Sequence, residues 1–222
     1  RSSAASDVYK RQVMTSLQQS IMNFGILMVQ GLVNSFGTVI MAAFAAAVKI
    51  DSFAYMPVQD FGNAFSTYVA QNYGAGKQER IRKGIKSAFV TSVIFCAIIS
   101  LLVIVFAKPL MCIFINPDET EIISAGVIYL CIEGSCYIGI GILFLLYGYY
   151  RAVNKPFMSV VLTVISLGTR VLLAYILSAI PAIGVIGIWV SVPIGWALAD
   201  ITGVVYYFVK SKKQLEMIEN NE

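Results

Sequence analysis

The sequence predicts an all-α, polytopic membrane protein built as a bundle of six transmembrane helices. Hydrophobic residues make up 58% of the 222 residues, and charged residues only 13%. The apolar residues gather in six stretches, each about 20 residues or longer, which is the length that a helix needs to cross a bilayer. These stretches lack the two-residue alternation of polar and apolar side chains that membrane β-strands show, so helices are expected.

The six spans are expected at residues 17–36, 38–71, 85–106, 122–150, 156–179 and 185–209. Three of them exceed the length that a bilayer requires, and such helices tilt, kink or project into the aqueous edge. Pro57 in the second span and Pro193 in the sixth lack a backbone N–H donor, so each should bend its helix.

Basic residues predict how the spans are oriented, because Lys and Arg near span ends stay on the cytoplasmic side. They gather in three segments, which hold Lys77, Arg80, Arg82, Lys83, Lys86, Arg151, Lys155, Lys210, Lys212 and Lys213. The loops on the other face hold Lys108 with Asp118, Glu119 and Glu121. We therefore expect a multi-pass protein of the cell membrane, surrounded by lipid, with both ends in the cytoplasm. The net charge of +4 then indicates topology, and no nucleic-acid partner is expected.

The chain divides into three segments by composition. Residues 1–12, RSSAASDVYKRQ, have no apolar core of the kind that a signal peptide needs, and the sequence changes abruptly at Val13. We interpret them as a non-native scar of sequence assembly or as a disordered cytoplasmic tail. The scar would imply that the natural protein continues upstream. Residues 13–213 are expected to form the six-helix lobe, and residues 214–222 a cytoplasmic tail.

The residue types in the chain exclude several chemistries. The chain has no histidine, which excludes histidine-ligated zinc, a Ser-His-Asp triad and a histidine proton relay within it. The four cysteines show no C-x-x-C spacing, and no G-x-S-x-G, P-loop or dinucleotide fingerprint occurs. Neither an enzyme nor an organic cofactor is therefore expected, and any proton or cation must be handled by carboxylates.

Charged side chains inside the spans are the candidate functional residues, because an ionisable group at bilayer depth is costly and suggests a function by default. They are Lys49, Asp51, Asp60, Glu133, Arg170 and Asp200. At about 1.5 Å of rise per residue, Lys49, Asp51 and Glu133 lie near mid-depth. Four acids against two bases leave the interior short of positive charge, which H+, Na+ or an organic ammonium would supply.

Helical spacing sorts the charged residues of the second span by face. Lys49, Phe53, Met56 and Asp60 follow an i, i+4, i+7, i+11 stripe. Asp51 points almost opposite to Lys49 on the same helix. We expect one face of this span to be a mixed charged and aromatic wall, with Lys49, Asp51 and Glu133 facing the lobe interior or a cleft.

A purely structural role for the same residues stays open. Lys49 or Arg170 would neutralise Glu133 in a static interhelical pair, or a buried acid would stay protonated and neutral. Gln30 and Asn34 in the first span are i, i+4 neighbours, and such amides either join helices or bind a ligand. The glycines around Glu133 favour close helix packing over bending during transport.

Residues 46–84 read AAVKIDSFAYMPVQDFGNAFSTYVAQNYGAGKQERIRKG. They contain a K/R-I-D/E element at Lys49–Asp51, the segment YVAQNYGAG at residues 68–76 and a basic E-R-x-x-K-G segment at residues 79–84. In combination these elements resemble the eighth helix and the following cytoplasmic loop of bacterial multidrug and toxic compound extrusion (MATE) transporters.

Two later segments, YRAVNKP at residues 150–156 and GIWVSVPIGWALAD at residues 187–200, resemble a later loop and the last helix of the same family. The resemblance covers residues 17–213. It implies a secondary antiporter of two six-helix lobes that exchanges Na+ or H+ for organic cations, with this chain as the second lobe of a twelve-helix protein. The first six-helix lobe and a small organic cation are then the expected partners.

One departure from the family pattern bears on the coupling ion. Family members that bind Na+ in this lobe typically have a carboxylate in the first of these six helices, and residues 17–36 contain none. Glu133 matches the other acidic position, so the resemblance makes it a candidate Na+ ligand. Proton coupling through an acid of the first lobe stays open.

A lipid-linked oligosaccharide flippase of the same wider superfamily is the alternative function. Such a flippase is expected to have a more basic central cavity. The excess of acids in these spans counts against that alternative.

Overall fold

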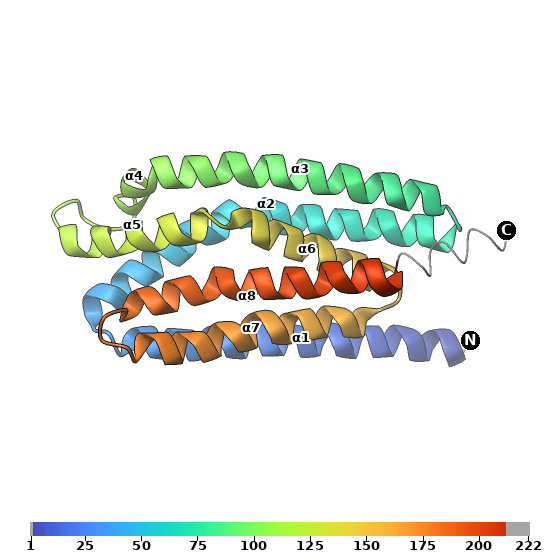
Figure 1. Ribbon diagram of the computed structural model, residues 1–222, viewed down its shortest axis with the longest axis horizontal. Coiled ribbons are helices and arrows are strands. Elements are labelled where there is room, and N and C mark those ends of the chain that lie inside the picture. Colours follow the sequence, from blue (N-terminus) through green and yellow to red (C-terminus); the bar gives the residue numbers. More distant parts are fainter. Residues whose placement is uncertain (1, 212–222) are drawn as a thin grey trace.

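The computed structural model describes residues 2–211, which form a bundle of helices without a strand in that range (Figure 1). The elements are α1 (Ser2–Asn34), α2 (Thr38–Gly74), α3 (Gln78–Val105), α4 (Ala107–Met111), α5 (Thr120–Gly134), α6 (Tyr137–Ala152), α7 (Pro156–Ser178), α8 (Val185–Tyr206) and the π-helical turn η1 (Tyr207–Ser211). The all-α prediction is confirmed. The tail predicted at residues 214–222 lies outside the described residues. Residues 2–12 continue α1, and their interpretation as a scar or a tail stays a prediction.

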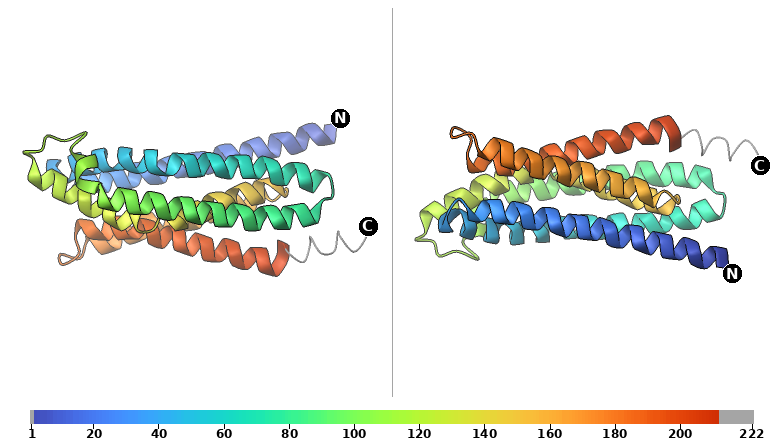
Figure 2. Two further views of the ribbon diagram at one scale, coloured as in Figure 1. Left: turned by 90° about the horizontal axis from the view of Figure 1, so that it is seen from above. Right: turned by 90° about the horizontal axis from the view of Figure 1, so that it is seen from below.

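The long helices run along one common axis and fall into two packed groups (Figures 1 and 2). In one group α2 packs on α3, α5 and α6. In the other, α7 packs on α8 and on α1, and contacts between the groups are sparser. Apolar side chains from both groups form one continuous core. A site that draws side chains from both groups therefore lies across the middle of the bundle.

The helices differ in how well they suit a membrane span, and α1 is the most polar of the long ones. By length and composition, α2, α3, α7 and α8 are each suited to cross a membrane, and α5 with α6 is a fifth candidate in the described part of the chain. α1 is long enough but is diluted by amides such as Gln19, Asn23 and Gln30. It still lies alongside α7 over much of its length. Among the long helices that the structure describes, α1 is therefore the most polar.

The fourth predicted span, residues 122–150, is not one straight helix. It is broken after Gly134, and α5 and α6 meet at an angle of 52°. At the break, the Cys136 N–H donates to the Glu133 carbonyl (2.9 Å), and the Ser135 hydroxyl donates to the Cys131 carbonyl (2.5 Å). These local bonds replace part of the regular helical ladder, which is how a broken helix is tolerated at membrane depth. Pro57 and Pro193 lie inside α2 and α8, neither of which is interrupted, and the bends predicted at these prolines stay a prediction.

The basic loops gather at one end of the bundle. The α2–α3 loop, the α6–α7 loop and η1 lie at the same end as the N-terminus, whereas the segment with Asp118, Glu119 and Glu121 lies at the opposite end (Figure 1). Burial lowers the pKa of Lys155 in the α6–α7 loop, and the neighbouring charge of Lys210 lowers it further. The basic loops predict a common end for residues 72–84, 151–155 and 210–222, and this is confirmed as far as residue 211, where the described residues end. Lys212 and Lys213 lie outside the described residues.

Glycines let the helices approach closely, as the sequence predicted. A Cβ atom on Gly148 of α6 would lie 2.5 Å from the Gly62 carbonyl oxygen of α2. A Cβ on Gly195 of α8 would lie 2.4 Å from the Ser166 carbonyl oxygen of α7. Both obstacles are backbone atoms, which cannot turn aside. Each glycine therefore sets the separation of the two helices that it joins.

Replacing Gly148 with alanine should destabilise the bundle, because the added methyl group forces α6 away from α2. We expect the free energy of unfolding to fall by about 1–3 kcal/mol, the usual cost of overpacking. Thermal unfolding of the purified protein in detergent measures this change. Gly168→Ala is the matched control in α7, since nothing lies within 4 Å of its added Cβ. Equal melting temperatures for the two variants would contradict the close contact.

Candidate functional site

Asp51 and Glu133 lie side by side in the interior of the bundle. Asp51 comes from the middle of α2 and is 4% exposed, and Glu133 comes from the last turn of α5 and is 1% exposed. The face of α2 that carries Asp51 is turned toward α5 and α6, since Asp51 contacts Tyr129 of α5 and Tyr137 of α6. Two carboxylates are thus removed from water and depend on protein groups for their hydrogen bonds.

Two tyrosines supply hydrogen bonds to these carboxylates. The Tyr137 hydroxyl donates to Asp51 Oδ1 (2.5 Å), and the Tyr129 hydroxyl lies 3.4 Å from Asp51 Oδ2. Tyr129 also interacts electrostatically with the Glu133 side chain. A phenol has one proton, so the Tyr129 hydroxyl donates a hydrogen bond to one carboxylate at a time. It can also accept a hydrogen bond from a carboxyl group that is protonated. It therefore links the two acids chemically.

The break between α5 and α6 positions these tyrosines. Tyr129 precedes Glu133 by four residues on α5, and Tyr137 is the first residue of α6, four residues after Glu133. All three side chains are nearly fully buried. The change of direction at Ser135 and Cys136 thus places one tyrosine on each side of Glu133.

Arg170 of α7 is the cation of the cluster. It is half-buried and interacts electrostatically with both Asp51 and Glu133. Its Nε and the Glu133 Oε1 are buried, and neither has a hydrogen-bond partner within the described residues. With all three groups ionised, the cluster carries a net charge of −1. It therefore has the charge to take up one monovalent cation or one proton, and Glu133 Oε1 is an unpaired acceptor for it.

Three aromatic rings seal the cluster from one side. Phe44 stacks on Trp189 (ring centroids 5.3 Å apart), and Tyr129 meets both rings edge-on at 5.6 and 5.1 Å. Such edge-to-face and offset contacts fix the ring orientations. Trp189 is 1% exposed, which fits a packing role. Phe44 and Trp189 fix the orientation of the Tyr129 ring, and the three rings make the surroundings of the buried carboxylates apolar.

The remaining predicted site residues lie outside this cluster. Lys49 is exposed, and its Nζ lies 5.8 Å from the centroid of the Phe114 ring, so it is not the partner of Glu133. Asp60 is also exposed, and with Lys49, Phe53 and Met56 it marks the outer face of α2, opposite to Asp51, as the helical spacing predicted. On α1 the Gln30 side-chain amide donates to Asn34 Oδ1 (3.1 Å), so the two side chains bind each other.

Asp200 lies apart from the cluster of Asp51, Glu133 and Arg170 on another helix, α8. Asp200 lies on α8 near Gly139 and Trp196, and its Oδ1 is buried without a hydrogen-bond partner in the described part of the chain. Among the described residues, no three His, Cys, Asp or Glu side chains come together to hold a metal ion. Na+ binding by Glu133 would thus need other oxygen donors, and it stays a prediction.

Tyr129 and Tyr137 were not among the residues predicted from the sequence. The available signal was their spacing, since each lies four residues from Glu133 and a tyrosine hydroxyl within an apolar span needs a partner. That spacing would have placed both on the face of Glu133 in a continuous helix. It does not reveal that the hydroxyls reach Asp51, because this contact depends on the packing of α2.

A buried charged cluster beside a broken helix in a membrane bundle is typical of secondary transporters. Comparison with known families agrees with that class. The family model MatE matches residues 13–176, and the chain therefore belongs to the MatE family.

Named relatives are similar over most of the chain. The chain is 24% identical over 205 residues to the probable multidrug resistance protein YoeA of Bacillus subtilis (strain 168), covering 91% of this chain and 44% of that protein. It is 28% identical over 159 residues to the probable multidrug resistance protein YpnP of the same organism, covering 72% and 35%. The chain thus spans less than half the length of these relatives.

Solved structures show the same fold. A crystal structure described as MATE in complex with MaL6 superimposes with a TM-score of 0.86 at 17% identity, covering 96% of this chain and 47% of that one. The likeness confirms that the bundle has the architecture of one lobe of a MATE transporter.

Replacing Tyr137 with phenylalanine should destabilise the protein, because Asp51 Oδ1 then loses its shortest hydrogen bond in a buried position. We expect the free energy of unfolding to fall by about 1–3 kcal/mol, the cost of leaving a buried polar group unpaired. Thermal unfolding in detergent measures the effect. Tyr175→Phe on α7 is the control, since Tyr175 is 46% exposed. A Tyr137 variant as stable as the Tyr175 variant would show that the hydrogen bond contributes nothing.

Proposed function

We propose that this chain acts as one lobe of a secondary antiporter, which exports small organic cations, such as drugs or metabolites, in exchange for H+ or Na+. The observation that carries the proposal is the buried Asp51–Glu133 pair, joined through Tyr129 at the break between α5 and α6. Membership of the MatE family and relatives named as probable multidrug resistance proteins support it.

The charge of the cluster suggests how an ion is coupled. With one proton or one Na+ bound, Asp51, Glu133 and Arg170 together become neutral, and a neutral cluster is stable when closed off from water. Without the ion the cluster keeps a net negative charge, which is costly in a low-dielectric interior. The unloaded site therefore favours an arrangement that readmits water or a cationic substrate. Antiport requires such a site, which is closed when the ion is bound and open when the ion has left.

We assign the outer faces of α1 and α2 to contact with the proposed partner, a first six-helix lobe. α2 exposes Lys49, Asp60 and the ring of Phe53, which is 71% exposed, and α1 exposes Gln19 and Asn23. A polar cavity of about 70 Å³ lies between α1, α2 and α6. Charged and amide groups at these positions are poorly suited to lipid. A second lobe would cover them and complete a substrate cleft at the interface of the two lobes.

The location that we propose is the cell membrane, with the basic end of the bundle in the cytoplasm. The positive-inside rule supports this orientation, because the basic loops and the acidic segment lie at opposite ends. The flippase alternative is not favoured. The cluster at the centre of this lobe holds two acids and one arginine, and the named relatives are described as multidrug resistance proteins.

Removing either carboxyl group of the cluster should impair coupled export. The test protein is a two-lobe chimera in which this chain replaces the matching 205-residue segment of YoeA. In vesicles, Glu133→Gln and Asp51→Asn should each lower ion-driven efflux of a cationic dye by roughly 100-fold, the scale expected when a proton-transferring side chain is lost. The initial rate under an imposed H+ or Na+ gradient is the measurement.

Glu121→Gln is the matched control for these substitutions. Glu121 is exposed in the first turn of α5, on the same helix as Glu133 but at its solvent end. This variant should retain the rate and the ion dependence of the unaltered chimera. Unchanged coupled efflux in the Glu133→Gln chimera would show that Glu133 is structural and that the coupling site lies elsewhere.

The isolated chain should not transport. Alternating access requires two lobes that move about a site at their interface, and one lobe supplies a single wall. Residues 13–222, reconstituted at dilutions that exclude dimers, should give no ion-driven flux of the dye, whereas the chimera should. Robust flux through the isolated chain would overturn the proposal that it is half of a transporter.

A further inference from the structure

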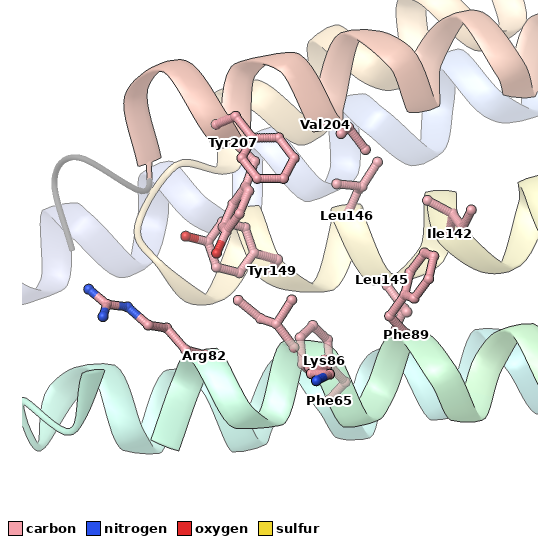
Figure 3. Close-up of a pocket in the computed structure, with 12 residues that line it drawn as sticks. Phe65, Arg82, Lys86, Phe89, Ile142, Leu145, Leu146, Tyr149, Val204 and Tyr207 are labelled. Atoms are coloured by element: carbon pink, nitrogen blue, oxygen red, sulfur yellow. The ribbon is translucent and has the colours of Figure 1, made fainter. Parts of the chain in front are cut away.

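A second cavity, separate from the acidic cluster, opens at the basic end of the bundle. It has a volume of about 470 Å³ and lies between α3, α6 and the α8–η1 segment (Figure 3). α3 and α8 each pack on α6 and have little contact with each other, so α6 forms the floor and the other two helices form the walls. Its volume falls within the roughly 300–1,000 Å³ that ligand sites occupy in proteins.

The helices that line this cavity present matching stripes. From α3 come Arg82, Ile85, Lys86 and Phe89, spaced i, i+3, i+4, i+7. From α6 come Ile142, Leu145, Leu146 and Tyr149 with the same spacing, and from α8 and η1 come Val204, Tyr207 and Phe208. This spacing gives each helix one continuous face toward the cavity.

The cavity is polar at its mouth and apolar further in. α3 begins at the basic end, so Arg82 and Lys86 lie in its first turns and Phe89 lies deeper. α6 ends at the basic end, so Tyr149 lies near the mouth and Ile142 lies seven residues deeper. Seven residues of helix span roughly 10 Å, which is about two-thirds of the hydrocarbon depth of one leaflet. The gradient from cationic to apolar follows that of one bilayer leaflet.

The cavity faces outward from the bundle, toward the surrounding lipid. Lys86 is exposed, and the rings of Phe89 and Phe208 are 46% and 59% exposed. The Tyr207 ring packs edge-on against Tyr149 (centroids 5.3 Å apart) and against Phe208 (5.3 Å). Tyrosines at this height are typical of the membrane–water interface. Tyr207 and Phe208 lie in the π-helical turn η1, and such turns are frequent at functional sites.

We propose that this cavity binds one anionic phospholipid of the surrounding bilayer. An acyl chain lies along Phe89, Ile142 and Leu145, and the phosphate group contacts Arg82 and Lys86. The two cations favour a lipid with net negative charge over a zwitterionic one, and basic pockets between transmembrane helices commonly hold such headgroups. No acidic side chain lines this cavity in the described residues, so an organic cation is disfavoured there. The proposal rests on the chain lying in a membrane and does not require the transport activity.

Native mass spectrometry of the full chain, released from detergent micelles, tests the proposal. The probes are dioleoyl phosphatidylglycerol and dioleoyl phosphatidylcholine at equal concentrations. We expect one phosphatidylglycerol molecule to bind at least several-fold more tightly than phosphatidylcholine. In the Arg82→Gln/Lys86→Gln double variant, the affinity for phosphatidylglycerol should fall on the order of 10-fold or more, because each basic residue near the headgroup contributes about fivefold.

Two further variants separate a built site from general attraction to a basic surface. Lys77→Gln/Arg80→Gln removes the same charge from the same end of the bundle, but neither residue lines the cavity. This variant should keep tight binding of one phosphatidylglycerol. Val204→Trp keeps both cations and fills the apolar part of the cavity from a position that is 37% exposed. It should weaken binding of the whole lipid several-fold.

Three results would overturn the proposal. Equal affinity of the unaltered chain for both lipids would remove the role of charge, and this comparison needs no variant to fold. An equal loss in the Lys77/Arg80 variant would indicate adsorption to the basic surface. Unchanged phosphatidylglycerol binding in the Val204→Trp variant would show that no acyl chain enters the cavity.

Discussion

The hydrogen bond from Tyr137 to Asp51 joins the two helices on which the rest of the lobe is arranged. An acid in the middle of α2 is tolerable at membrane depth only when protein groups replace its water, and the hydroxyls of α5 and α6 do so. Tyr137 reaches Asp51 because the chain changes direction after Glu133. The close approach of Gly62 and Gly148 further along the same helices maintains this separation. The break, the glycine contact and the buried acids are therefore parts of one arrangement.

Much of the fold follows from patterns that can be read along the chain. Hydropathy separates the helices, and the distribution of Lys and Arg places three loops at one end, because these signals depend on the solvent around each segment. The break at Ser135 does not follow from them. The residues on both sides of the break are apolar, so hydropathy averaged over a window does not change there. The first span is the least marked of the six in hydropathy, because amides such as Gln19 and Asn23 interrupt its apolar residues.

Less of the site was predictable. Spacing on α2 correctly set Asp51 opposite to Lys49, because the helical period alone decides this. The position of Lys49 near the middle of its span suggested that it belongs with Asp51 and Glu133. Its side chain lies instead on the outer face of α2, near Phe114. The partners of the acids come from α5, α6 and α7, and their meeting depends on how the helices pack. Helical spacing fixes neighbours within one helix, whereas Arg170 and Asp51 are neighbours only in the folded bundle.

The division of the bundle into two packed groups gives the acidic cluster a mechanical meaning. Asp51, Glu133 and both tyrosines belong to the group built around α2, whereas Arg170 and Trp189 belong to the group of α1, α7 and α8. A small slide of one group along the other changes the distance from the guanidinium to the carboxylates. Coulomb energy varies inversely with that distance and is least screened in the interior. The protonation or ion occupancy of two side chains is thereby tied to the relative position of two sets of helices.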